Sequence, residues 1–137
     1  MVRNIAAAVV GIVVAFALVW VVEKTGHAVY PPPENLNFAD AEAMQDYVAT
    51  LPLGALLFVA AAWFAGAAAG TCAACAIGTA RPMYLAVVVG GLVFVAASIN
   101  LLMIPHPIWF SVLGLAGILV GAGLGTMCKR ATASSAE

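Results

Sequence analysis

Six polar side chains in this apolar sequence have the types and spacing that binding chemistry needs. They are Glu23, Lys24, His27, Tyr30, Asn100 and His106. If a helix runs through the first four, Glu23 and His27 stand four residues apart and share one face. The six groups could hold a small polar ligand, a lipid headgroup or a quinone ring. In the alternative interpretation, which the residue types alone favour, they satisfy exposed helix ends and tie a loop to neighbouring helices.

Two histidines and a carboxylate also form a ligand set for zinc or iron, so His27, His106 and Glu23 are candidate metal ligands. Their spacing is not a local metal-binding motif. A general acid or base role for His27 or Glu23 is open as well, although no nucleophile with a neighbouring base accompanies them. The sequence therefore favours a protein without enzymatic activity, and it implies no particular cofactor.

Cys72 and Cys75 form a CxxC pattern, which is typical of thiol–disulfide exchange or metal binding. The pattern lies in an apolar segment without a nearby cation, where a thiolate is disfavoured. We therefore expect both residues to act as small apolar side chains. With Cys128 the cysteines are odd in number, so we expect no disulfide to staple the fold.

The composition places this chain in a membrane. Hydrophobic residues make up 65% of the 137 residues and charged residues only 8%, against about 25% charged residues in a soluble domain. So few charges could not cover a water-facing surface, and lipid must be the solvent for most of it. The net charge of −1 and the lack of a basic tract exclude nucleic acid as a partner.

The chain is expected to form one all-α domain over residues 1–137. Four apolar segments are long enough to span a hydrocarbon layer of about 30 Å. They cover residues 4–22, 52–76, 83–104 and 108–128. The Pro-His-Pro sequence at 105–107 permits only an antiparallel hairpin, so an up-down four-helix transmembrane bundle follows. Residues 131–137 are expected to form a disordered tail.

The connection at residues 23–51 is expected to carry a short amphipathic helix. Met44, Tyr47, Val48 and Leu51 form one apolar stripe at helical spacing. Asn37 is the expected N-cap. Since the helix has negative net charge, it is poorly suited to an anionic lipid surface, and we expect it to lie across the mouth of the bundle.

Basic residues predict the orientation of the four spans. Arg3, Arg81, Lys129 and Arg130 fall on one side, and Lys24 alone falls on the other. The positive-inside rule therefore places both termini in the cytoplasm and all six polar candidates outside. Because no ionisable residue falls inside an expected span, an ion-coupled pump is not expected.

Small residues recur every four positions in the apolar segments and predict close helix packing. The clearest rows contain Gly66 and Gly70 in one segment and Gly117, Gly121 and Gly125 in another. These rows either build the core of one chain or form the interface of a homo-oligomer.

Two polar stretches, EKTGHAVYPPP and NLLMIPHPIWF, carry a resemblance together with YVATLPLG. As a set they resemble a group of uncharacterised small four-helix membrane proteins of bacteria. The resemblance implies a four-helix fold and a multi-pass location in the bacterial inner membrane. It brings no activity with it.

The first functional expectation is a structural or interaction protein that packs with itself, with membrane lipid or with a larger membrane complex. The second is a protein whose outer polar cluster binds a metal, a quinone or a small polar ligand, and acts on it if it is an enzyme. The third is a permeation pathway formed by an oligomer. The second expectation differs from the other two because it gives the six polar residues a role in binding.

Overall fold

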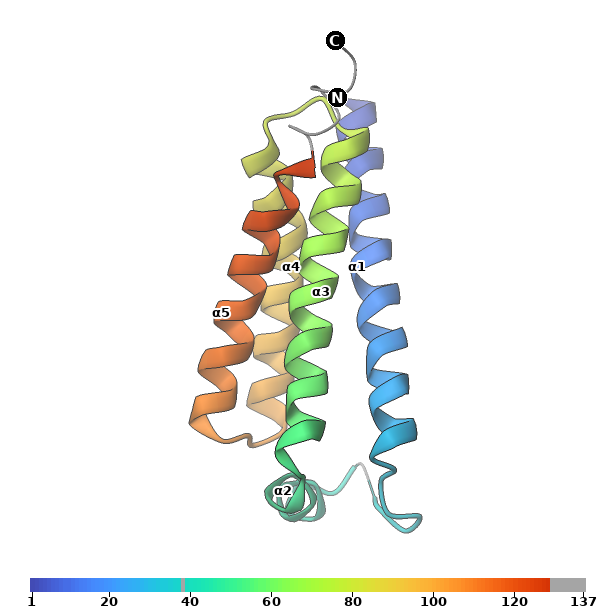
Figure 1. Ribbon diagram of the computed structural model, residues 1–137, viewed down its shortest axis with the longest axis vertical. Coiled ribbons are helices and arrows are strands. Elements are labelled where there is room, and N and C mark those ends of the chain that lie inside the picture. Colours follow the sequence, from blue (N-terminus) through green and yellow to red (C-terminus); the bar gives the residue numbers. More distant parts are fainter. Residues whose placement is uncertain (38, 129–137) are drawn as a thin grey trace.

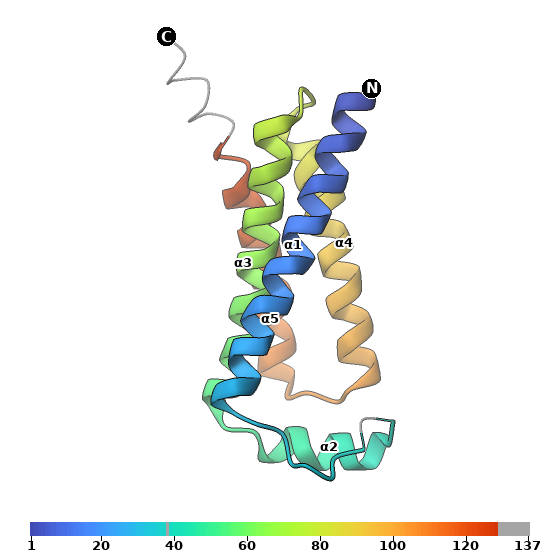
Figure 2. The same ribbon diagram turned by 90° about the vertical axis from the view of Figure 1, so that its right-hand side faces the viewer.

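The computed structural model describes residues 1–37 and 39–128, and in them the chain forms helices and no strand. The helices are α1 (Val2–Val29), α2 (Ala41–Thr50), α3 (Leu53–Ile77), α4 (Pro82–Met103) and α5 (Ile108–Gly125). Four run along the long axis of the molecule, and α2 crosses one end of it, which we call the α2 end (Figures 1 and 2). All but α2 are long and apolar enough to cross a membrane. The all-α four-helix bundle is confirmed, and the chain is a multi-pass membrane protein.

The first helix is longer than expected. It does not end at residue 22 but continues to Val29, so that Glu23, Lys24 and His27 belong to the helix rather than to a loop. The helix continues through Gly26. A β-carbon at Gly26 would lie 3.2 Å from that of Phe58. The glycine therefore serves the contact between α1 and α3.

The short helix α2 begins where the sequence changes from prolines to acidic residues. Asp40 is its N-cap and accepts hydrogen bonds from the backbone N–H groups of Glu42 at 3.0 Å and Ala43 at 3.3 Å. The expectation that Asn37 caps the helix is wrong. The Asn37 side chain instead accepts a hydrogen bond from the Ala39 N–H and shapes the preceding turn.

The helix α3 lies at the centre of the bundle, and its main partners are α1 and α5. A β-carbon on Gly70 would stand 2.5 Å from the Gly11 carbonyl oxygen, and one on Gly66 would meet Val19 at 2.6 Å. On α5, a β-carbon on Gly121 would stand 2.5 Å from the Phe64 carbonyl oxygen. These glycines therefore let backbones touch within a single chain, as a core role requires.

The other two glycines of the α5 row differ from each other. A β-carbon on Gly117 would be 3.7 Å from that of Phe64, an ordinary van der Waals contact. Gly125 is tighter, because a β-carbon there would lie 2.5 Å from the Ala68 carbonyl oxygen and 3.0 Å from the Cys72 nitrogen. The close approach at Gly125 brings the end of α5 onto α3.

This approach leads to a disulfide that the sequence did not predict. Cys72 on α3 is bonded to Cys128, just beyond α5, with a Cα–Cα distance of 5.3 Å. The expectation that no disulfide staples the fold is wrong, and so is the treatment of Cys72 as a mere apolar filler. Cys75 is buried, and its thiol lies 3.9 Å from the Pro82 carbonyl oxygen.

The bundle is tied together at the end opposite α2 by the first residues of α1. The Asn4 side-chain oxygen accepts hydrogen bonds from the Thr79 N–H at 2.8 Å, the Thr79 hydroxyl at 3.0 Å and the Ala80 N–H at 3.0 Å. The Arg3 Nε donates to the Ile77 carbonyl at 2.7 Å. Lys129, Arg130 and the tail 131–137 lie outside the described residues.

Candidate functional site

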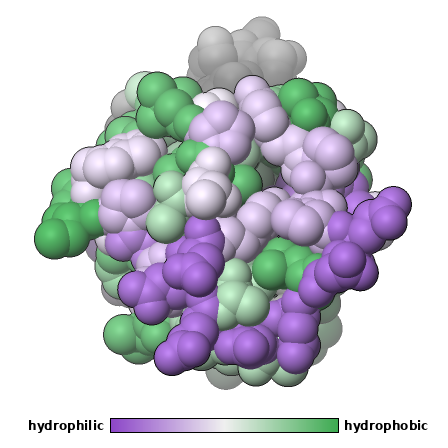
Figure 3. Space-filling view, turned by 90° about the horizontal axis from the view of Figure 1, so that it is seen from below, coloured by the Kyte–Doolittle hydropathy of each residue, from purple (hydrophilic) through white to green (hydrophobic). Residues whose placement is uncertain are grey.

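A cavity of about 240 Å³ lies at the α2 end of the bundle. Residues of α1, α2, α3 and α4 line it, together with the hairpin between α4 and α5. Five of the six polar candidates are among the 14 lining residues: Glu23, His27, Tyr30, Asn100 and His106. Figure 3 views this end of the molecule and shows hydrophilic residues gathered on it. Side chains that are far apart in the sequence therefore meet in one place.

The position of each polar group follows from a helix end. Because α1 continues to Val29, it carries Glu23 and His27 to the cavity one turn apart. Asn100 comes from the last turn of α4, and His106 from the three-residue turn that follows. These helix ends all lie at the same end of the up-down bundle.

The roof of the cavity is formed by α2. Met44 and Val48 are only 9% and 5% exposed, and both line the cavity together with Tyr47. The apolar stripe of this helix thus faces the bundle, as expected for a helix that lies across the mouth (Figure 2). Leu51, at the end of the stripe, completes the roof.

His106 is held in one orientation. Its Nδ1 lies 2.7 Å from the Ile104 carbonyl oxygen, and its ring stacks on Phe110 with centroids 4.9 Å apart. Since a carbonyl only accepts, Nδ1 must carry the proton. Burial lowers the pKa of His106 below its usual value, although the hydrogen bond to Ile104 opposes this shift. The neutral ring therefore leaves Nε2 as an acceptor.

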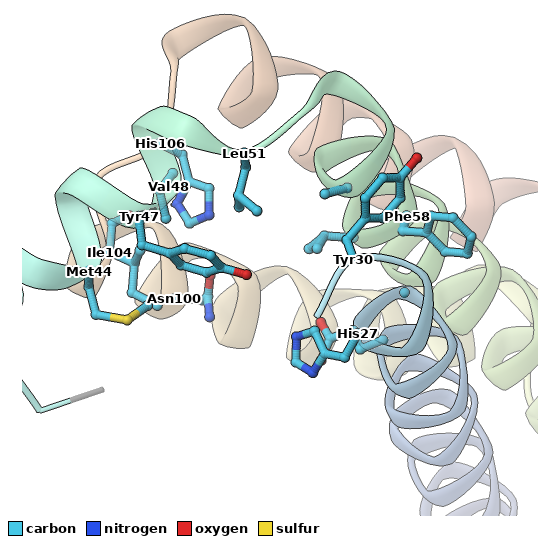
Figure 4. A pocket seen from close by; sticks show the side chains of 14 residues that line it. His27, Tyr30, Met44, Tyr47, Val48, Leu51, Phe58, Asn100, Ile104 and His106 are labelled. Atoms are coloured by element: carbon cyan, nitrogen blue, oxygen red, sulfur yellow. Dashed lines mark hydrogen bonds between the residues drawn. The ribbon is translucent and has the colours of Figure 1, made fainter. Parts of the chain in front are cut away.

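Two further polar groups stand beside His106. Figure 4 shows Tyr47 and Asn100 on its side of the cavity and His27 and Tyr30 on the other. Burial raises the pKa of Tyr47, so the phenol stays protonated and can donate a hydrogen bond. The Asn100 amide can both donate and accept.

The opposite wall combines a carboxylate with aromatic rings. Glu23 is half-buried and lies close to His27 and to the Trp63 side chain. Tyr30 packs edge-on against Phe58, with centroids 6.1 Å apart and planes at 69°. Gly54 makes room for this arrangement, because a β-carbon there would collide with the Tyr30 hydroxyl. The wall thus presents one negative group and two aromatic side chains.

Lys24 is the candidate that the structure places outside the cavity. Its ammonium group lies 5.8 Å from the centre of the Trp20 ring, one turn back along α1. A cation over an indole face is a favourable arrangement that draws the lysine away from the cavity. Trp20 and Lys24 are four residues apart, so the sequence contained a signal for this pairing. The sequence analysis instead grouped Lys24 with the hydrophilic residues that follow it.

The candidate metal site is not formed in this structure. In residues 1–37 and 39–128, no three His, Cys, Asp or Glu side chains are grouped so that they could hold a metal ion. Glu23, His27 and His106 all border the cavity, but the two histidines face it from opposite sides (Figure 4). The structure therefore does not bring these three residues together as a group of metal ligands.

Sequence reasoning missed Tyr47 as a site residue. It was assigned only to the apolar stripe of the short helix, yet it lines the cavity. A phenol in such a stripe brings a polar group to the surface that the stripe covers, which was the available signal. Phe58 carried no signal, because nothing in an apolar run distinguishes a residue that lines a cavity.

Comparison of the chain with protein family models, with curated proteins and with solved structures finds no match. The resemblance to small four-helix membrane proteins of bacteria therefore stays a prediction. The geometry of the cavity carries the functional argument.

Proposed function

We propose that this protein binds a small amphipathic molecule in the cavity at its α2 end. Five polar candidates from three separate parts of the sequence converge on one cavity there, and this observation carries the proposal. Ligand sites are commonly apolar cavities with a few convergent polar groups. Apolar residues such as Met44, Val48 and Ile104 supply the remaining walls here.

The alternative of a purely structural cluster accounts for less of this geometry. A structural cluster directs its polar atoms to helix ends, and the His106 Nδ1 follows that pattern through Ile104. The Asn100 side chain is exposed and borders the cavity. An exposed amide at the border of the cavity is available to a ligand.

The ligand is proposed to enter from the outer side of a bacterial inner membrane, with both termini in the cytoplasm. The distribution of the basic residues supports this orientation, since Arg3 and Arg81 lie at the end opposite α2. The α2 end would then meet the outer leaflet and the water beyond it. A ligand with apolar and polar parts suits that boundary.

Filling the cavity tests the proposal. Ala55 is 9% exposed and lines the cavity, so an Ala55→Leu substitution removes part of its volume. Ala61 is exposed on the same helix, and Ala61→Leu is the matched control. Native mass spectrometry after mild detergent extraction should show a small molecule bound to the unsubstituted chain and to Ala61→Leu, but not to Ala55→Leu. Identical spectra for all three chains would contradict the proposal.

A further inference from the structure

The cavity is bordered by a carboxylate and by no lysine or arginine among the described residues. Among the described residues that line it, Glu23 is the one carboxylate, and none is lysine or arginine. The nearest cation in the sequence, Lys24, is directed to Trp20 instead. An anionic ligand would therefore meet a carboxylate without a lysine or arginine to compensate for it, which is unfavourable in a partly buried site.

The surroundings of the cavity carry the same sign. The segment that joins α1 to α3 contains four acidic residues and no basic residue: Glu34, Asp40, Glu42 and Asp46. A group of like charges at the mouth of a cavity raises the local concentration of the opposite ion. This end of the molecule therefore attracts small cations.

The walls suit an organic cation better than a metal ion. Tyr30, Tyr47 and Phe58 all line the cavity, and aromatic faces attract ammonium groups. The His106 Nε2 adds a neutral acceptor. Apolar residues such as Leu51 and Val59 complete the lining and would contact a hydrocarbon body.

We infer that the ligand is an organic ammonium ion with an apolar body, whose charged nitrogen lies near the Glu23 carboxylate. This inference rests on the proposed function, because it names the class of molecule that the cavity takes. The same chemistry occurs in a free amphipathic amine and in the ethanolamine headgroup of a phospholipid. The ammonium group is common to both sources.

Three probes with one carbon skeleton test the charge preference. They are 3-phenylpropylamine, 3-phenylpropanol and 3-phenylpropionate, which at pH 8 are cationic, neutral and anionic. At this pH an ordinary carboxyl group is ionised and an ordinary histidine is neutral. Calorimetric titration of the purified full chain in a non-ionic detergent should show that the amine binds at least about tenfold more tightly than the alcohol.

Two substitutions locate this preference. Glu23→Gln keeps the size of the side chain and should abolish the advantage of the amine. Lys24→Gln changes the neighbouring charge outside the cavity and should preserve it. If Glu23→Gln does not fold, the comparison of the three probes on the unsubstituted chain still decides the question.

A lipid arm distinguishes the two sources. The chain is reconstituted with equal amounts of phosphatidylethanolamine and phosphatidylglycerol, and the lipid retained after extraction is measured. Preferential retention of phosphatidylethanolamine that is lost in Glu23→Gln supports a headgroup. An amine preference without lipid preference supports a free amine.

Two other outcomes would overturn the inference. If the alcohol or the propionate binds as tightly as the amine and neither lipid is preferred, the ligand is not an ammonium ion, while the binding function stands. If no probe binds and no lipid is retained, the inference and the proposed function fail together.

Discussion

His106 has one ring nitrogen occupied by the fold and the other available to a ligand. The Nδ1 hydrogen bond to Ile104 and the stacking on Phe110 fix the ring before any ligand arrives. A fixed ring loses little conformational freedom on binding, which favours affinity. The same burial that fixes it lowers its pKa, so that the protonation of this residue is linked to the stability of the fold.

The depressed pKa of His106 predicts a loss of stability in mild acid. The unfolded chain takes up a proton near the ordinary histidine pKa of about 6.5, whereas the folded chain resists it until a lower pH. The contribution is therefore complete above about pH 6.5 and is lost as the pH falls towards the folded-state pKa. The thermal midpoint in detergent should decrease as the pH is lowered from 7 to 5.

The His106→Asn variant supplies the comparison for this prediction. Asparagine can still donate a hydrogen bond to the Ile104 carbonyl, but it does not titrate. Its thermal midpoint should depend less on pH over the same interval. An equal dependence in both chains would show that other groups cause the effect.

At the scale of the helices, the packing of α5 on α3 combines glycine contacts with a covalent bond. Gly121 and Gly125 bring the two backbones together, and the disulfide between Cys72 and Cys128 closes the same face. The bond lies at the end that basic residues assign to the cytoplasm, where thiols are usually kept reduced. We expect the glycine contacts to hold α5 against α3 where the thiols are reduced.

Two glycines two residues apart, on different faces of α5, test this packing. Gly121→Leu should lower the thermal midpoint and the folded yield strongly, because its β-carbon would collide with the Phe64 carbonyl oxygen. A collision with backbone typically costs about 1–3 kcal/mol or more. A β-carbon on Gly123 would meet nothing within 4 Å. Gly123→Leu should therefore leave the thermal midpoint nearly unchanged, and equal losses in the two variants would contradict the assignment of Gly121 to the core.

At the scale of the molecule, the sequence predicted the features that depend on lipid. The four spans and the hairpin at 105–107 follow from apolar length and short connections, and the structure has both. The sequence also predicted that Glu23, His27, Asn100 and His106 lie close together, because an up-down bundle brings these helix ends to one side.

Features that depend on how helices turn about their axes could not be predicted. The bond between Cys72 and Cys128 requires that α5 present one particular face to α3, which apolar composition does not determine. The position of Lys24 outside the cavity could not be predicted for a similar reason, since the direction of its side chain depends on the rotation of α1. The presence of a cavity depends on the distance between α2 and the ends of the long helices, and the sequence does not determine this distance.

The orientation of the whole molecule decides which compartment the cavity faces, and it gives the last prediction. Four basic residues are expected on one side and one on the other, so the α2 end should face outward. A cysteine introduced at the exposed Glu34 should react with a membrane-impermeant maleimide in intact cells, whereas one at Thr79, at the opposite end, should react only after lysis. In the unsubstituted control, Cys72 and Cys128 are bonded to each other and Cys75 is buried, so the background should be low. Labelling at Thr79 but not at Glu34 would place the cavity in the cytoplasm. The disulfide would then lie in the oxidising compartment, and the acidic mouth of the cavity would attract cytoplasmic amines instead.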